Sequence, residues 1–306
     1  LDVDVTVTLS SDAPHKNEIA ERLNILGGTL LVDCLEMAQI IAGSDLIIGT
    51  GGMSSWERCC LSKPTILIIN AENQRANAIA LESVGAAKVI HARGSGNKVV
   101  DAVSTLLGSR LELEEMAKCA GKICDGLGSN RLALAIETKP KTKAGKTVQL
   151  RPVLESDSET MLTWQQHPAI RRFARNSVAP ERKQHLAWLS KKLADPNCIF
   201  NIVTQNEEPV GVVRFDYLSK KKGFEVSILI APNFQNRGVA RLALAQSRIL
   251  LNDWDLYAYV KESNKTSMIL FKRSGYIDTS EPGWLLARND NQHSESRSLM
   301  AYKVNL

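Results

Sequence analysis

A turn rich in backbone donors follows an apolar strand near residue 230 of this chain. Residues 224–230 are mostly apolar, Pro232 ends the run, and the pattern Gln235-x-x-Gly238-x-Ala240 leads into a helical stretch. Backbone N–H groups in such a turn, together with the positive end of a helix dipole, form a site for a diphosphate. Gly238 lets the backbone approach the anion closely. The segment therefore predicts a binding site for a phosphorylated ligand.

A second glycine-rich turn lies in the first half of the chain, between a buried strand and a helix. Bare backbone and a helix dipole again suit a diphosphate, and a carboxylate on the helix can accept both hydroxyls of a ribose. The same residues also fit a plain helix cap with turn glycines, so both interpretations stay open here. The residues concerned are Gly49, Gly51, Gly52, Ser54, Ser55 and Glu57.

Strands and helices alternate over residues 1–136, which predicts a parallel sheet covered on both faces. Residues 137–147, where Lys, Thr, Pro and Gly replace apolar residues, predict a solvated linker and a domain boundary. The strands are expected at 3–9, 29–32, 46–49, 65–69 and 87–90, and the helices at 16–24, 36–42, 54–61, 74–84, 99–107 and 111–124.

Residues 148–306 follow a different order: a strand, two helices, two antiparallel strands, a strand–loop–helix unit, a strand, a helix and closing strands. This order predicts an α/β domain with a mixed sheet. The strands are expected at 149–153, 200–204, 210–217, 224–230, 256–260, 285–288 and 298–304, and the helices at 157–165, 181–194, 239–251 and 265–273.

The turn and the element order of the second half resemble those of the GNAT acetyltransferases, whose acetyl-CoA loop reads Q/R-x-x-G-x-G/A. The resemblance implies acetyl-CoA as the cofactor, with its pyrophosphate on the loop and its pantetheine arm paired to the preceding strand. Asn264 matches the asparagine that contacts CoA after the fifth strand of that family. The implied cofactor-binding residues are Leu229, Ile230, Ala231, Gln235, Asn236, Arg237, Gly238, Val239, Ala240, Asn264 and Phe271.

Acetyl transfer to an amine needs a held thioester, a deprotonated amine and a polarised carbonyl. Glu225 resembles the glutamate on the fourth strand of the family and is the candidate base, acting through water. It also fits a solvated carboxylate at a strand end. Phe271 stands where many family members have a tyrosine that protonates the leaving thiolate. We take Tyr276 as the candidate for that role, with Tyr257, Tyr259 or water as alternatives; a further alternative is that the thiolate leaves unaided.

The segments Leu150-Arg-Pro, 164–173 and His185-Leu-Ala-Trp188 resemble ribosomal-protein acetyltransferases. They are still more similar to the N-acetyltransferases that modify the 4-amino group of a UDP-4-amino-4,6-dideoxy-N-acetyl-altrosamine. The resemblance implies that this region forms the acceptor wall, where guanidinium groups can bind a diphosphate. The candidate acceptor-binding residues are Arg171, Asn176 and Arg214.

The first half resembles the C-terminal domain of GT-B-type nucleotide-sugar enzymes. The resemblance rests on Gly51-Gly52, Ser54, Trp56-Glu57-Arg58, Ala71, Asn73-Gln74 and Asp125-Gly126-x-Gly128-x-x-Arg131. It is strongest to the UDP-2,4-diacetamido-2,4,6-trideoxy-β-L-altropyranose hydrolases of pseudaminic acid biosynthesis. The implied UDP-sugar site comprises Gly51, Gly52, Ser54, Ser55, Glu57, Asn73 and Gln74.

These hydrolases have a further N-terminal domain that carries a catalytic histidine in a glycine-rich loop. Neither His15 nor His91 sits in such a motif, so we expect this half to bind a UDP-sugar without hydrolysing it. Composition limits the other roles. A net charge of +5 with 5% aromatic residues does not indicate nucleic-acid binding, and the chain has no run of eighteen apolar residues. Its six cysteines fit no zinc spacing. We expect a cytoplasmic protein with no metal and no membrane span.

Together the strand and helix patterns and the two resemblances imply a Rossmann-like GT-B half-domain with a parallel sheet, followed by a GNAT acyl-CoA N-acyltransferase domain with a mixed sheet. The predicted function is transfer of acetyl from acetyl-CoA to the 4-amino group of a UDP-amino-sugar in pseudaminic acid biosynthesis. One alternative is a protein N-terminal acetyltransferase. The other is a nucleotide-sugar-binding module without catalytic activity.

Overall fold

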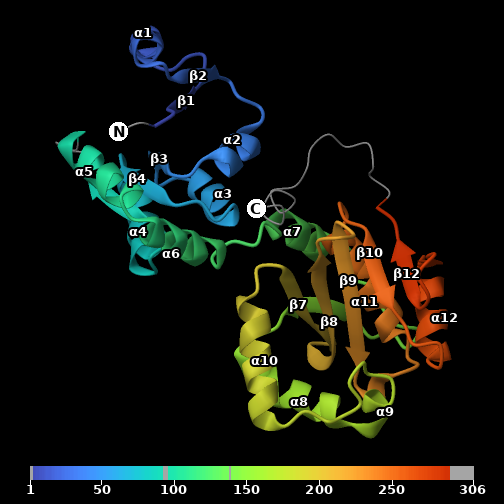
Figure 1. Cartoon of the computed structure of the whole chain (residues 1–306). Coiled ribbons are helices and arrows are strands. Elements are labelled where there is room, and N and C mark those ends of the chain that lie inside the picture. The colour runs from blue at the N-terminus through green and yellow to red at the C-terminus, as the bar shows by residue number, and fades with distance from the viewer. Residues whose placement is uncertain (1–2, 92–95, 138, 290–306) are drawn as a thin grey trace. The chain divides into compact units, whose positions relative to one another are not determined.

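The structure is a computed structural model that describes residues 3–91, 96–137 and 139–289 (Figure 1). The described residues divide into two compact units, one ending at Cys124 and the other beginning at Asp125. The domain bounds inferred above, 1–136 and 148–306, therefore remain a prediction. The strand expected at 298–304 lies outside the described residues. None of the described helices is both long and apolar enough to cross a bilayer.

The first unit consists of parallel strands and helices, as the alternation predicts. β1 pairs with β2, and β3, β4 and β5 form a three-stranded sheet with β4 in the middle. The elements are β1 (Thr6–Leu9), α1 (Lys16–Leu26), β2 (Thr29–Val32), α2 (Met37–Gly43), β3 (Ile47–Thr50), α3 (Ser54–Cys60), β4 (Thr65–Ile69), α4 (Glu72–Ser83), β5 (Lys88–His91), α5 (Gly96–Leu107) and α6 (Arg110–Gly121).

The central strand β4 is covered on both faces, because successive side chains of a strand point in opposite directions. Leu67 packs with Cys59 and Leu81 in one apolar cluster. Ile66, the preceding residue, packs with Leu106 in another. Both strand residues are fully buried. A strand that is apolar on both sides therefore fixes the parallel sheet between its helices.

The second unit has a seven-stranded mixed sheet in the order β11-β12-β10-β9-β8-β7-β6. All pairs in it are antiparallel except β9 with β10. The elements are α7 (Gly128–Ile136), β6 (Val148–Pro152), η1 (Glu155–Asp157), α8 (Ser158–Gln166), α9 (Pro168–Arg171), α10 (Arg182–Ala194), β7 (Cys198–Gln205), β8 (Glu208–Leu218), β9 (Gly223–Ile230), η2 (Pro232–Phe234), α11 (Val239–Leu250), β10 (Leu256–Tyr259), α12 (Lys265–Arg273), β11 (Ile277–Asp278) and β12 (Trp284–Ala287).

The helices α8 and α10 cover one face of this sheet (Figure 1). Met161 and Leu189, from these two helices, are buried together with Phe200, Ile202 and Val212 of the sheet. The apolar side of α11 is buried as well, and this helix contacts both β6 and β9. The two antiparallel strands and the strand–loop–helix unit therefore lie where the sequence predicts them. Their bounds shift by at most two residues.

The helix α7 was not predicted. Asn130 on this helix donates from Nδ2 to the carbonyl oxygen of Leu250 at 2.9 Å, at the end of α11. Residues 125–131 are expected in a motif of the first half. By contacts, α7 groups with the second unit, where it packs on α11.

Candidate active site

The strands β9 and β10 are parallel neighbours that pair over only two residues of each strand. Their register ends at Tyr257 opposite Glu225. Beyond this point the strand continues to Ile230 while its other edge stays fully paired to β8. The free edge of residues 226–230 therefore offers backbone donors and acceptors to an extended ligand, which can bind there as an added strand.

The turn after β9 has the conformation that the sequence predicts. Asn236 and Gly238 both have positive φ, 60° and 83°, which puts two backbone bends within three residues. Gln235 donates from Nε2 to the carbonyl oxygen of Ile230 at 3.0 Å and ties the turn to the strand. The first helical hydrogen bond of α11 runs from Leu242 to Gly238. The preceding N–H groups therefore remain available to an anion.

A cleft with a volume of about 1680 Å³ lies along this edge and is lined by residues of the second unit. It includes the turn 235–240, both Leu229 and Ile230, and the start of α12. Asn264 caps α12, because its Oδ1 accepts from the backbone N–H of Ser267 at 3.1 Å. Of the cofactor-binding residues implied by the sequence, only Ala231 is absent from the lining; its N–H donates to the carbonyl of Val210.

Tyr276 is not retained as a proton donor. Its side chain is only 2% exposed and does not line the cleft. Its hydroxyl is buried and has no hydrogen-bond partner among the described residues, and burial raises the pKa of Tyr276 well above the usual value for tyrosine. The ring instead packs edge-on against Phe271 at 5.0 Å, and Phe271 forms part of the wall. Tyr259 does line the cleft and is 41% exposed, which makes it the better candidate of those considered.

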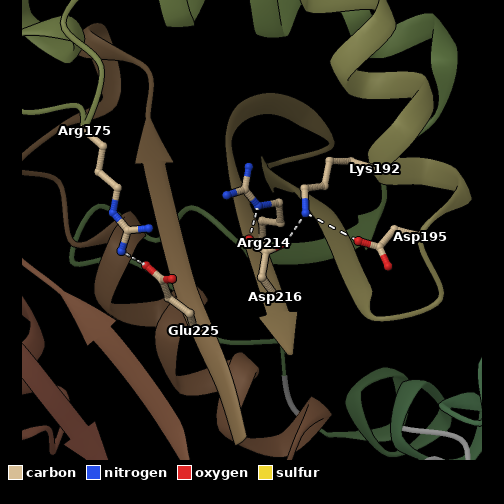
Figure 2. Close-up of polar contacts among 6 residues, drawn as sticks. All are labelled: Arg175, Lys192, Asp195, Arg214, Asp216 and Glu225. Atoms are coloured by element: carbon tan, nitrogen blue, oxygen red, sulfur yellow. Dashed lines mark hydrogen bonds and ion pairs between the residues drawn. The ribbon is translucent and has the colours of Figure 1, made fainter. Parts of the chain in front are cut away.

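Glu225, the candidate base, lies in the cleft with its carboxylate bonded to the guanidinium of Arg175 (Figure 2). The side chain of Glu225 is 15% exposed and that of Arg175 is 60% exposed. The guanidinium also lies over the ring of Tyr259, with its Cζ 5.0 Å from the ring centroid. Arg175 therefore links the candidate base and the candidate acid, although no motif in the sequence points to it.

Arg171 and Asn176 shape the loop that carries Arg175. Arg171 donates from Nη1 to the carbonyl oxygens of Asn176 and Val178, at 3.0 and 3.2 Å. Asn176 accepts at Oδ1 from the N–H of Val178 at 2.9 Å. Lys261 donates to the carbonyl of Ala174 at 2.5 Å. Arg171 and Asn176, the two predicted residues, both line the cleft, and their polar groups hold the loop in place.

Arg214 belongs to a charged group on the sheet face that α10 covers (Figure 2). Its Nε donates to Asp216 at 2.7 Å, and the same carboxylate accepts from Lys192 at 2.6 Å. Burial raises the pKa of Asp216, but the charges of Arg214 and Lys192 outweigh it and hold that pKa below its usual range. The Arg214 guanidinium lies 5.4 Å from the ring centroid of Trp188 and lines the cleft. Its terminal amino groups are the part that can reach a ligand.

The charge of the cleft is strongly one-sided. Among the described residues, ten Lys or Arg side chains line it, and Glu225 is the only carboxylate. A wall of this kind attracts anions and disfavours cations. The ten are Lys141, Lys143, Lys146, Arg171, Arg175, Arg214, Arg237, Arg241, Lys261 and Arg273.

In the first unit, the predicted nucleotide-sugar residues gather at one edge of the parallel sheet, because they follow the carboxyl ends of β3 and β4. Ser55 is buried and accepts from Arg58 at 3.1 Å, so it holds that guanidinium in place. Arg58 also donates to the carbonyl of Thr50 at 2.6 Å. A Cβ at Gly49 would meet the guanidinium of Arg58, so a larger residue there would displace that side chain. The remaining predicted residues, Gly52, Ser54, Glu57, Asn73 and Gln74, are partly or fully exposed, and Gly51 is buried.

Family models match both halves of the chain. Residues 147–277 match the acetyltransferase (GNAT) domain, and residues 31–135 match the glycosyltransferase family 28 C-terminal domain. The second unit thus contains an acetyltransferase (GNAT) domain, and a glycosyltransferase family 28 C-terminal domain precedes it. The predicted fold class, enzyme class and cofactor are confirmed.

Several solved structures are similar to part of the chain. A domain from Methanocaldococcus jannaschii is 19% identical, with a TM-score of 0.41, and the match covers 46% of this chain and 96% of that one. The aminoglycoside acetyltransferase AAC(6′)-Ib with coenzyme A is 17% identical, with a TM-score of 0.41 and coverage of 47% and 95%. A chimera of spermidine N-acetyltransferase SpeG from Vibrio cholerae is 19% identical, with a TM-score of 0.38 and coverage of 43% and 81%. No curated protein matches the chain.

Proposed function

We propose that the second domain transfers the acetyl group of acetyl-CoA to the 4-amino group of a UDP-4-amino-4,6-dideoxy-N-acetylhexosamine, a step of pseudaminic acid biosynthesis. The observation that carries this proposal is the charge of the cleft. CoA brings three phosphates and a UDP-sugar brings two more, and the ten cationic side chains of the lining match that charge. A polyamine acceptor would meet the same cations and only one carboxylate.

The loop of Arg171, Arg175 and Asn176 and the terminal amino groups of Arg214 lie on the acceptor side of this cleft. Arginine suits a diphosphate because its planar donors bind two oxygens at once. Glu225 then receives the proton that leaves the amine, through a water molecule, when the nitrogen bonds to the acetyl carbon and the carbon–sulfur bond breaks. Tyr259 or water returns a proton to the departing thiolate.

The first domain supports the same substrate class. A glycosyltransferase family 28 C-terminal domain points to nucleotide sugars. The hydrolase that it resembles consumes the product of the proposed acetyl transfer. A domain that holds this product beside the enzyme that makes it raises the local concentration of the intermediate. We propose that Gly51, Gly52, Ser54, Ser55, Glu57, Asn73 and Gln74 form its UDP-sugar site, with Ser55 acting through Arg58.

A thiol-release assay with acetyl-CoA tests the proposal. It compares three acceptors: a UDP-4-amino-4,6-dideoxy-N-acetylhexosamine, a peptide with a free N-terminus, and spermidine. We expect thiol release with the UDP-sugar and mass spectrometry to show one added acetyl group on it. Preference for the peptide would support a protein N-terminal acetyltransferase instead. No release with any acceptor, together with no heat of CoA binding, would support the alternative of a nucleotide-sugar-binding module without catalytic activity.

A further inference from the structure

The lysine-rich stretch between the two family matches folds back as a hairpin rather than crossing open solvent. Lys141 forms an isolated antiparallel bridge with Thr147. The N–H of Val148 donates to the carbonyl of Pro140 at 2.9 Å, and the N–H of Thr142 donates to that of Lys146 at 2.8 Å. Thr142 is only 7% exposed, and its Oγ1 accepts from the N–H of Lys146 at 3.2 Å. We call residues 140–148 the lysine hairpin.

Sheet topology brings this hairpin to the end of the sheet that carries the diphosphate turn. The register places Leu150 opposite Val203, Val203 opposite Gly211, and Gly211 opposite Ile230. Because all three pairs are antiparallel, β6 begins at the end where β9 finishes. In agreement, the hairpin residues Lys141, Lys143 and Lys146 line the same cleft as Arg237 and Arg241.

These five cations have no acidic partner among the residues that the structure describes. All five are exposed, and within the described ranges no ion pair joins any of them to an acidic side chain. The sole carboxylate of the lining, Glu225, already pairs with Arg175. Glu207, in the turn between β7 and β8, and Glu208, the first residue of β8, lie outside the lining. This end of the cleft is therefore set up for a ligand of high negative charge.

The cofactor carries phosphate in two places with different needs. Its pyrophosphate suits the backbone N–H groups of the turn 235–240. Its separate 3′-phosphate is a terminal, solvent-facing group, and flexible ammonium groups bind such a group as point charges. We propose that Lys141, Lys143 and Lys146 bind the 3′-phosphate of CoA, so that the segment joining the two family matches is part of the cofactor site. The inference rests on acetyl-CoA as cofactor and not on the identity of the acceptor.

Calorimetry on the full chain, with CoA and with 3′-dephospho-CoA, tests this inference. The variant K141Q/K143Q/K146Q removes the three charges. We expect its affinity for CoA to fall roughly tenfold, as three exposed ionic contacts would give, with its affinity for 3′-dephospho-CoA unchanged within twofold. The variant K191Q/K220Q/K222Q is the matched control. It removes the same charge from exposed lysines outside the cleft lining and is expected to behave as the wild type.

Two outcomes would overturn the inference: equal losses for both ligands in the hairpin variant, or the same selective loss in the control. The first would mean that the lysines act only by general attraction or through the fold, and the second that net charge alone matters. Binding of neither ligand by the wild-type chain would instead contradict the cofactor assignment itself. The proposed acceptor is untouched by any of these results.

Discussion

Arg175 and Glu225 form an ion pair in the cleft, between the loop after α9 and the strand β9 (Figure 2). The guanidinium that covers the candidate base also lies over Tyr259. The guanidinium donates to Oε1 of Glu225, one of the two oxygens that could accept a proton. Movement of Arg175 away from Glu225 would free that oxygen for the proton of the amine. We propose that the diphosphate of the acceptor draws Arg175 away, so that binding an anionic acceptor frees the base.

Replacement of Arg175 tests whether its guanidinium leaves Glu225 for the diphosphate of the acceptor. We expect Arg175→Ala to lower kcat/KM for the UDP-amino-sugar about tenfold to a hundredfold, since a charge-assisted contact to a phosphate is lost. The same variant should not lower the rate with the amino-sugar that lacks UDP, because Glu225 is then free. Steady-state kinetics with the two acceptors measure both effects.

Arg182→Ala is the control for that variant. Arg182 also pairs with a glutamate, Glu159, but lies outside the cleft lining. It should leave both rates within twofold. An equal loss of rate for the two acceptors in Arg175→Ala would contradict the exchange.

Glu225→Gln removes the candidate base and keeps the size of the side chain. We expect kcat to fall by about a hundredfold, the usual worth of a general base, with the affinity for CoA within twofold of the wild type. A thermal melt checks that the variant remains folded. Unchanged kcat would return Glu225 to the interpretation as a solvated strand-end carboxylate.

We expect opposite results when Tyr276 and Tyr259 are replaced. Tyr276→Phe should leave kcat within twofold, because the hydroxyl is buried and unpartnered outside the cleft lining. Removing an unsatisfied buried hydroxyl should not destabilise the protein either. Tyr259→Phe should lower kcat about tenfold if its hydroxyl returns the proton to the thiolate. A larger loss in Tyr276→Phe than in Tyr259→Phe would reverse this assignment.

The cofactor loop was predictable from the sequence because its chemistry is local. Gln235 and Gly238 act through the backbone of a single turn, and their spacing is visible in the chain. The relation of Arg175 to Glu225 was not predictable, because the two residues lie fifty positions apart and meet only through the loop that Arg171 holds. Nothing in the spacing of Tyr276 indicates that Phe271 covers it.

The same contrast holds for the fold. The spacing of apolar residues and the turn residues between them predicted nearly every strand of both units. The helix α7 was not predicted because its sequence is short and the helix packs on α11 through a long-range contact of Asn130. The basic stretch before β6 reads as a spacer by composition, and only the buried Thr142 and the bridge at Lys141 reveal a hairpin.

Asp157 gives a prediction on stability. Its carboxylate accepts two hydrogen bonds from Arg151, at 2.7 and 2.8 Å, and one from the N–H of Leu154 at 2.8 Å. The hydrogen bond from Arg151 outweighs burial and lowers the pKa of Asp157. A lowered folded-state pKa stabilises the protein above the unfolded value, and this contribution is lost as pH falls below about 4.

We therefore expect Asp157→Asn to lower the free energy of unfolding by about 2 kcal/mol at neutral pH. The difference from the wild type should shrink as the pH falls toward 3. Urea unfolding at a series of pH values measures it. If the difference in free energy of unfolding between Asp157→Asn and the wild type stays constant with pH, the charge of Asp157 does not stabilise the protein.

The central claim is that the cleft is built for an anionic amine acceptor. The most direct measurement compares kcat/KM for the UDP-4-amino-sugar with that for the same 4-amino-sugar lacking UDP, at one salt concentration and saturating acetyl-CoA. We predict at least a hundredfold preference for the UDP form. Equal values, or a preference for the sugar that lacks UDP, would contradict the account.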